Sequence, residues 1–350
     1  MNICFTISSL HCGGSERVIS TLANNFVKSG HQVSIILVST CDKTSFYELE
    51  KEVNVVALLK NEKRTSYLKR VVDLRRAFKK LKPDVVVAFL PHICIYSYYA
   101  LRGLRIPLIC SERNDPNKYS PKRIKALRKV FSKASGCVFQ TNDARKFYGE
   151  VKDDRCTIIP NPVYLLPEAI NIKPKEEKLF VSVGRLEKQK RFDLLINAFA
   201  KFCKKKSDYK LEIYGSGSLK GELTELINNL DINSSVQLID NNPKWHMEVK
   251  KATAFVSSSD FEGMPNCLEE ALCLGCQCIA TDCSIGGSRD LIDLLDAGLL
   301  IKPNCEEELI SAFEKADNHK IKINHDGFDI LSDKRISSLW IDFMKRVSKQ

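Results

Sequence analysis

The segment Leu179–Arg185, which reads LFVSVGR, predicts a buried β-strand that ends in a turn at Gly184. Arg185 lies in that turn, Lys190 follows five residues later, and residues 194–199 have the apolar spacing of a helix. A strand, a turn with two cations and a helix predict a phosphate-binding element, because arginine offers a planar fork of donors and lysine a point charge. A solvated basic loop is the alternative interpretation.

Strands and helices alternate in the same way along the whole chain, which predicts parallel sheets with helices on both faces. Strands are expected in the first half at residues 2–7, 32–38, 53–58, 85–89, 107–110, 136–140 and 156–159. Strands are expected in the second half at residues 179–183, 209–214, 236–239, 254–257 and 277–281. A chain of 350 residues is long enough for about two domains. We place the boundary between residues 161 and 178, where prolines and a charge run at 173–178 break the pattern.

A second segment, Phe261–Glu270 (FEGMPNCLEE), places two carboxylates, Glu262 and Glu270, eight positions apart. Between them are the residues of a turn that should open a helix: Gly263, Pro265 and Asn266. A helix start offers free backbone N–H groups to an anion. A carboxylate just beyond it can accept hydrogen bonds from adjacent hydroxyls, such as a ribose diol, so the segment favours a sugar nucleotide. An ordinary capped helix with two exposed acids is the alternative.

Three further segments follow predicted strands of the first half, at the sheet edge where ligands bind to α/β proteins. Gly13 and Gly14 let the backbone approach a ligand at a helix start, although a tight turn without a ligand would look the same. His92 follows the strand at 85–89 in a predicted loop, where it could donate to a sugar or act as acid or base. A hydrogen-bonded structural histidine is the alternative. Arg113 follows the next strand beside Glu112, and an internal ion pair is the alternative there.

Three motifs resemble those of the family 4 glycosyltransferases. Residues 183–186 with Lys190, and residues 262–266 with Glu270, are similar to the donor-site signatures of that family. Residues 13–18 are similar to its Gly-Gly-Ala-Glu-Arg segment. The resemblance spans nearly the whole chain and keeps the order of the motifs, which makes it more specific than any single motif.

The chain also departs from the family pattern. Ser15 stands where alanine is usual, Arg191 stands where glycine is usual, and the glycine-rich loop expected near residues 238–240 is missing. The first two changes leave the motifs recognisable. The third affects the expected contacts to a nucleotide base more than those to its phosphates.

The resemblance implies the GT-B fold, an α/β architecture of two Rossmann-like doubly wound domains facing a cleft. Residues 1–162 would form the acceptor-side domain, and residues 163–332 would form the donor domain that binds the nucleotide sugar. The segment 333–350 would be a helix that crosses back to the first domain.

The resemblance further implies transfer of a hexosyl or N-acetylhexosaminyl unit from a UDP-sugar to a glycan acceptor, with retention. Arg185 and Lys190 would neutralise the diphosphate, so that no metal is needed, while Glu262 would hold the sugar hydroxyls and Glu270 the ribose hydroxyls. His92 and Arg113 are further catalytic candidates. Donor contacts are also expected from Gly13, Gly14, Gly184, Gly215, Gly263, Pro265 and Asn266.

The positive charge is concentrated in the first half of the chain. Of the net charge of +11, residues 1–175 contribute +15 and the remainder −4. The cations gather at 60–82 and 118–133, two segments with the spacing of amphipathic helices. The apolar stripe expected in the first consists of Leu68, Val71, Val72, Phe78 and Leu81. A basic amphipathic surface favours a polyprenyl-diphosphate-linked acceptor at the inner face of the plasma membrane, with a solvated helix face as the alternative.

The remaining features of the sequence limit the classes of protein to which the chain can belong. No nucleic-acid motif is present, and the pI of 8.9 lies below the usual range of nucleic-acid-binding domains. The 14 cysteines, including the pair at 273 and 276, predict apolar packing in a reducing cytoplasm rather than a zinc site or disulfides. We expect no signal peptide. The apolar run 85–101 is expected to form a strand, a loop at Pro91–His92 and a buried helix, not a membrane span.

Three other functions remain open for a chain with these motifs, of which nucleic-acid binding is the least favoured and would require salt-sensitive binding. A UDP-sugar epimerase would share much of the architecture and would convert its substrate without an acceptor. A non-catalytic subunit would bind a sugar nucleotide and transfer nothing.

Overall fold

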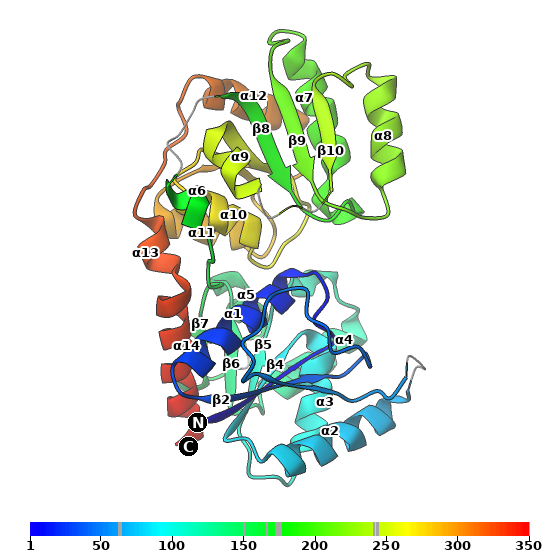
Figure 1. Cartoon of the computed structure of the whole chain (residues 1–350), viewed down its shortest axis with the longest axis vertical. Coiled ribbons are helices and arrows are strands. Elements are labelled where there is room, and N and C mark those ends of the chain that lie inside the picture. Colours follow the sequence, from blue (N-terminus) through cyan, green and yellow to red (C-terminus); the bar gives the residue numbers. More distant parts are fainter. Residues whose placement is uncertain are drawn as a thin grey trace. The chain divides into compact units, whose positions relative to one another are not determined.

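The computed structural model describes residues 1–61, 65–149, 151–165, 167–171, 177–240, 242 and 245–349. The predicted charge run at 173–178 lies outside these residues except for its last two positions. The chain divides into two compact units (Figure 1). The first comprises Met1–Pro162 and Ser332–Gln350, and the second comprises Val163–Leu331.

The first unit is built on a parallel seven-stranded sheet with the order β3-β2-β1-β4-β5-β6-β7. Its strands are β1 (Asn2–Ile7), β2 (Gln32–Leu37), β3 (Asn54–Ala57), β4 (Val85–Phe89), β5 (Leu108–Ser111), β6 (Gly136–Phe139) and β7 (Cys156–Ile158). Most strand positions are buried, because helices cover both faces of such a sheet. The strand order reverses between β1 and β4, which is where ligands bind in doubly wound sheets.

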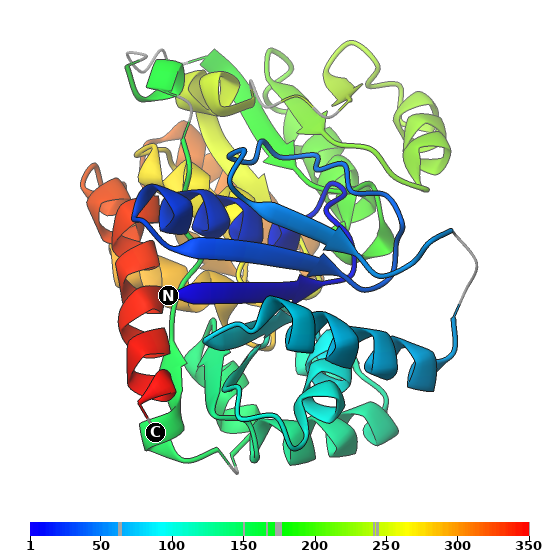
Figure 2. The same ribbon diagram turned by 60° about the horizontal axis from the view of Figure 1, so that its bottom comes forward.

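Helices pack on both faces of this sheet (Figure 2). They are α1 (Gly14–Lys28), α2 (Tyr67–Leu81), α3 (Pro91–Leu101), α4 (Pro121–Phe131), α5 (Asn142–Phe147) and α14 (Asp333–Ser348), with short 3₁₀ turns η1 (Pro116–Lys118) and η2 (Asp153–Arg155). Serine or threonine side chains cap α2, α4 and α5 by accepting from a backbone N–H of the first turn. Helix α1 buries one stripe at helical spacing, and α2, α3 and α4 pack against one another in sequence.

The last helix, α14, belongs to the first unit. Its Trp340 is fully buried and stacks on Phe89 with ring centroids 5.9 Å apart. The Asn25 amide of α1 donates hydrogen bonds to Asp333 Oδ2 and Ser337 Oγ, each at 3.0 Å. A buried aromatic pair therefore packs α14 against β4, and two hydrogen bonds from one amide join it to α1.

The second unit has a parallel six-stranded sheet with the order β10-β9-β8-β11-β12-β13. Its strands are β8 (Glu177–Val183), β9 (Lys210–Tyr214), β10 (Val236–Ile239), β11 (Ala252–Ser257), β12 (Cys278–Thr281) and β13 (Leu299–Ile301). Its helices are α6 (Pro167–Asn171), α7 (Phe192–Cys203), α8 (Lys220–Asn229), α9 (Trp245–Lys251), α10 (Asn266–Cys273), α11 (Gly287–Leu295), α12 (Glu306–Asp317) and α13 (Gly327–Leu331), with the 3₁₀ turn η3 (Lys188–Lys190). Aromatic rings of β8, α7 and α12 form the core on one face, where Phe180, Phe199, Phe202 and Phe313 meet.

The prediction of two doubly wound parallel α/β sheets is confirmed. Two local predictions are wrong. The loop expected at Pro91–His92 is the first turn of α3, because a proline fits the first helical position, whose N–H has no helical partner. The apolar stripe expected in α2 is wrong in part: Leu68 is 73% and Val72 45% exposed, and Leu74 and Phe78 are the buried residues.

Candidate donor-binding site

The second unit brings two sequence motifs together where its strand order reverses. Strands β8 and β11 are neighbours at that reversal. The segment after β8 carries Arg185 and Lys190, and the segment after β11 carries Glu262. Lys190 Nζ lies 2.6 Å from Glu262 Oε1, although the two residues are 72 positions apart. The geometry therefore places a cation and an acid at the sheet edge where doubly wound folds bind ligands.

The Lys190–Glu262 ion pair is mostly shielded from solvent. The side chains are 18% and 13% exposed, and Ser259 Oγ donates a second hydrogen bond to Glu262 Oε1 at 2.9 Å. Burial lowers the pKa of Lys190, but the nearby Glu262 and Cys267 outweigh burial and the repulsion of Arg185, so the pKa is raised overall. Lys190 is therefore a fixed positive charge at neutral pH. The side chain of Arg185 is exposed beside it.

Glycines let the turns of this site approach each other more closely than side chains would allow. A Cβ at Gly215 would lie 1.9 Å from the Gly184 carbonyl oxygen, and a Cβ at Gly184 would lie 2.8 Å from Lys190 Cε. Gly184 N donates to the Tyr214 carbonyl at 3.0 Å, which fixes the two turns. Gly184 and Gly215 thus shape the site through the backbone.

The residues predicted after Glu262 form the entry to α10. Gly263 is buried against α11, since a Cβ at Gly287 would lie 1.7 Å from the Gly263 carbonyl oxygen. Pro265 is buried and precedes the helix, and Asn266, half-buried, is its first residue. The turn after Glu262 therefore opens a helix at Asn266, as the motif predicted.

Glu270 lies inside α10 and is almost fully buried. His246 Nε2 of α9 lies 2.7 Å from Glu270 Oε2, and the two side chains are 3% and 2% exposed. The partnership between this acid and a histidine 24 positions earlier was not predicted, because nothing in the spacing of α9 points to α10. The carboxylate is held in one orientation by this contact.

In the first unit, Gly13 and Gly14 form the start of α1 after β1. His92, in the first turn of α3, lies with its Nε2 2.8 Å from Ser8 Oγ, at the strand-order reversal between β1 and β4. Burial, and then the positive charges of Arg123 and Arg70, lower the pKa of His92 to about 4. His92 is therefore neutral at physiological pH and suits hydrogen bonding better than acid catalysis.

Arg113 lies in the interior of the first unit. Its Nη1 donates to Asn161 Oδ1 at 2.8 Å, and its guanidinium carbon lies 4.5 Å from the Phe89 ring centroid and 5.5 Å from that of Trp340. A buried guanidinium stacked on two core rings supports the packing of α14. These contacts favour a structural role for Arg113, and its catalytic role stays a prediction.

Glu112, the sequence neighbour of Arg113, is also structural. Its Oε2 accepts from Tyr148 Oη at 2.6 Å, and its Oε1 accepts from Tyr119 Oη at 2.8 Å. Burial raises the pKa of Glu112 overall, although these hydrogen bonds lower it.

Two surface cavities accompany the first unit. A cavity of about 790 Å³ runs along α4 and is lined by Lys125, Arg128, Lys129 and Phe147 among others, and no predicted site residue lines it. A cavity of about 280 Å³ is lined by Ser8, Ser9, His11, Ser39 and Thr40 at the ends of β1 and β2. The second is the one that adjoins the predicted ligand edge.

All 14 cysteines are free thiols, and those at 273 and 276 are buried. Within the described ranges, no group of three or more His, Cys, Asp or Glu side chains could hold a metal ion. No helix in the described part of the chain is long and apolar enough to cross a membrane.

The chain has two parallel-sheet α/β units, and one of them carries a cation and an acid at its strand-order reversal. This architecture is that of the GT-B class, and comparison with known proteins gives the same class. Residues 12–165 match the family described as Glycosyltransferase Family 4, and residues 168–325 match the description Glycosyl transferases group 1. The chain is 32% identical over 89% of its length to an α-1,4-N-acetyl-D-galactosaminyltransferase of Campylobacter jejuni. That enzyme is named for the acceptor GalNAc-α-(1→4)-GalNAc-α-(1→3)-diNAcBac-PP-undecaprenol, and the match covers 87% of it.

Solved structures of low identity share the fold. Sucrose-phosphate synthase from Thermosynechococcus elongatus superposes with a TM-score of 0.82 at 14% identity, over 99% of this chain and 98% of that one. HepE from Anabaena in complex with UDP superposes with a TM-score of 0.77 at 15% identity, over 99% and 100%. The chain therefore belongs to the family 4 glycosyltransferases, and it is a glycosyltransferase of the GT-B fold.

Proposed function

We propose that this glycosyltransferase moves a hexosyl or N-acetylhexosaminyl unit from a UDP-sugar to a polyprenyl-diphosphate-linked glycan, with retention and without a metal ion. The observation that carries the proposal is the charged Lys190, fixed by Glu262 beside Arg185 at the strand-order reversal of the second unit. The Campylobacter relative is named for a reaction on such a lipid-linked glycan, and the HepE structure holds UDP.

The chemistry follows from where charge develops. When the bond between the sugar and the diphosphate breaks, the leaving diphosphate gains negative charge. Fixed cations near it stabilise that state more than the bound substrate, which is the condition for acceleration. In the proposal Lys190 and Arg185 supply these cations, which is the task a metal ion performs in other enzymes.

Glu262 and Glu270 have different parts in the proposal. Glu262 would accept hydrogen bonds from the sugar hydroxyls through Oε2, because the contacts that the described residues make with its carboxylate are to Oε1. Glu270 would bind the ribose. Because the Glu270 side chain is 2% exposed, the geometry supports the diphosphate contacts more directly than the ribose contact. The remaining donor contacts that we propose are backbone contributions of Gly13, Gly14 and the start of α10.

A membrane-bound acceptor is supported by the exposed face of α2. Tyr67, Leu68 and Val72 are exposed apolar side chains among the cations of that helix, which include Lys69 and Arg76. Exposed apolar groups beside cations are the composition of a surface that binds anionic lipid. We therefore propose a peripheral attachment at the inner face of the plasma membrane.

The test is transfer from UDP-GalNAc and UDP-galactose to a polyprenyl-diphosphate-linked glycan, with the product extracted and its anomeric configuration read by NMR. An α-linked product formed in the presence of a chelator supports the proposal. Conversion of the UDP-sugar without acceptor would identify an epimerase instead. Binding of UDP with no transfer to any lipid-linked acceptor would identify a non-catalytic subunit.

A further inference from the structure

The segment that carries Lys190 is joined to the segment that carries Glu262 by a second set of contacts, outside the ion pair itself. Ser258 Oγ donates to the Lys190 carbonyl at 2.8 Å, and Gln189 Nε2 donates to the Phe261 carbonyl at 2.7 Å. Asp260 N donates to the Gln189 carbonyl at 2.9 Å. These three hydrogen bonds have donors in both segments, and they fix the two segments relative to each other.

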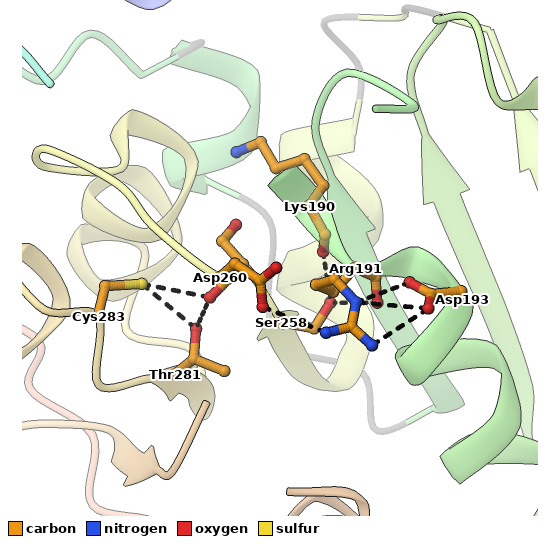
Figure 3. Close-up of polar contacts among 8 residues, drawn as sticks. Lys190, Arg191, Asp193, Ser258, Asp260, Thr281 and Cys283 are labelled. Carbon is orange, nitrogen blue, oxygen red and sulfur yellow. Dashed lines mark hydrogen bonds and ion pairs between the residues drawn. The ribbon is translucent and has the colours of Figure 1, made fainter. Parts of the chain in front are cut away.

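Arg191 adds the one charged link between these segments outside the Lys190–Glu262 pair in the part of the chain described. Its Nη1 lies 3.3 Å from Asp260 Oδ1, while its Nε lies 3.1 Å from Asp193 Oδ1 in α7 (Figure 3). We call the Arg191 guanidinium with its two acids, Asp260 and Asp193, the Arg191 fork. In the same view the Lys190 side chain points away from the Arg191 fork, and the Lys190 carbonyl faces Ser258. The planar guanidinium can bond an acid on each side at once, which lysine cannot do.

The backbone of Arg191 supports a specific role for its side chain. Its φ of 50° and ψ of 42° lie in the left-handed region, which glycine adopts freely and other residues adopt at a cost. A strained residue persists when surrounding contacts fix it, and strain of this kind clusters at functional sites.

The far end of the Glu262 segment is also fixed. The Ser259 carbonyl accepts from Thr281 Oγ1 at 2.5 Å and from Cys283 Sγ at 3.2 Å. Thr281 is the last residue of β12 and Cys283 follows it two positions later (Figure 3). Ser259 Oγ in turn bonds Glu262. The Glu262 segment is thus held by β12 on one side and by the Arg191 fork on the other.

We propose that Arg191 is a positioning residue: through Asp260 it fixes the distance and direction between Lys190 and Glu262, and so sets the diphosphate-stabilising geometry. This inference rests on the proposed function. Arg191 touches neither donor nor acceptor in the proposal. Its effect is on the transition state, because a small displacement of a fixed cation costs more in the rate than in the affinity for the donor.

The test compares variants on the two sides of the fork. Arg191→Gly fits the left-handed backbone and removes the fork, and Asp260→Asn removes only the link to the Glu262 segment. Asp193→Asn, the matched control, removes the local link to α7. We expect kcat to fall about tenfold or more in the first two variants, with KM for the UDP-sugar and Kd for UDP changed by less than about threefold. Asp193→Asn should stay within about twofold of the wild-type kcat, and Arg191→Lys should restore part of the loss in Arg191→Gly.

The outcomes separate the inference from the proposed function. If the wild-type protein transfers sugar and both Arg191→Gly and Asp260→Asn keep kcat within about twofold, the positioning role is refuted. It is refuted equally if kcat falls in all three variants together with a matching fall in thermal stability, since the fork would then serve stability alone. If the wild-type protein neither binds UDP nor transfers sugar, the proposed function fails instead.

Discussion

The pairing of Lys190 with Glu262 makes an unusual prediction: removing the acid should tighten UDP binding while it slows transfer. Glu262 sits 2.6 Å from the cation that the diphosphate needs, so it competes with the diphosphate and repels it. Glu262→Gln keeps the volume of the side chain and can still accept from Ser259, but it removes the negative charge.

The magnitude follows from Coulomb's law and the exposure of the pair. Two unit charges at about 4 Å interact by about 1 kcal/mol in water and about 4 kcal/mol at an effective dielectric constant near 20. Since the two side chains are 18% and 13% exposed, an intermediate effect of about 1–2 kcal/mol is expected. That corresponds to UDP binding about 5- to 30-fold tighter in the variant.

The assay is isothermal titration of UDP into the wild-type and Glu262→Gln proteins at low and high salt, alongside kcat for transfer. The expected result is a lower Kd, a difference that shrinks with salt, and a kcat lower by about tenfold or more. Weaker UDP binding in Glu262→Gln would refute the reasoning, because it would show that the ordering of Lys190 by the acid outweighs the competition between the acid and the diphosphate.

Three further predictions concern other parts of the molecule. The lowered pKa of His92 means that its neutral form is favoured in the folded state, so its contribution to stability is complete above pH 6.5 and is lost as the pH falls toward 4. In urea unfolding at a series of pH values, His92→Gln should remove up to about 3 kcal/mol of the loss of unfolding free energy between pH 6.5 and 4. The same dependence of unfolding free energy on pH in the variant and the wild-type protein would contradict this prediction. Gly215→Ala should destabilise the protein by about 2 kcal/mol or more, because its Cβ would lie 1.9 Å from a carbonyl oxygen. Gly221→Ala, in open space in α8, should stabilise it by about 0.5–1 kcal/mol, and equal melting temperatures for the two would disprove the close approach. Leu68→Glu with Val72→Glu should reduce flotation with anionic liposomes at unchanged melting temperature, and equal flotation would exclude α2 as the lipid-binding surface.

The sequence was sufficient for the architecture because each parallel strand is a continuous apolar run with a turn after it. Strands such as β1 and β4 begin and end where the pattern predicts. The three-residue strand β13 was not predicted, since its apolar run is too short to show a period. The exposure of Leu68 also escaped prediction. Helical spacing shows that residues share a face, but not how far along the helix the sheet covers that face.

The site could be predicted in its parts but not in its contacts. The resemblance implied that Arg185, Lys190 and Glu262 contact one donor, and each lies in a segment that follows a strand. The direct ion pair depends on β8 and β11 being neighbours, which is a property of strand order and not of either motif. His246 and Arg113 also show that the position of a residue in the sequence does not reveal its contacts. The pairing of the histidine with Glu270 had no signal in the sequence, and the arginine had a position that suggested chemistry although its surroundings are a core.

The central claim is that Arg185 and Lys190 bind the diphosphate of the donor. The most direct measurement is the Kd for UDP in Arg185→Ala and Lys190→Ala, with Lys188→Ala as the matched control, an exposed cation of the same turn. Loss of a hydrogen bond to a charged group costs about 1.5–3 kcal/mol, so the account predicts UDP binding about 10- to 100-fold weaker in the first two variants and unchanged binding in the third. Equal affinities in all three variants and the wild-type protein would contradict it.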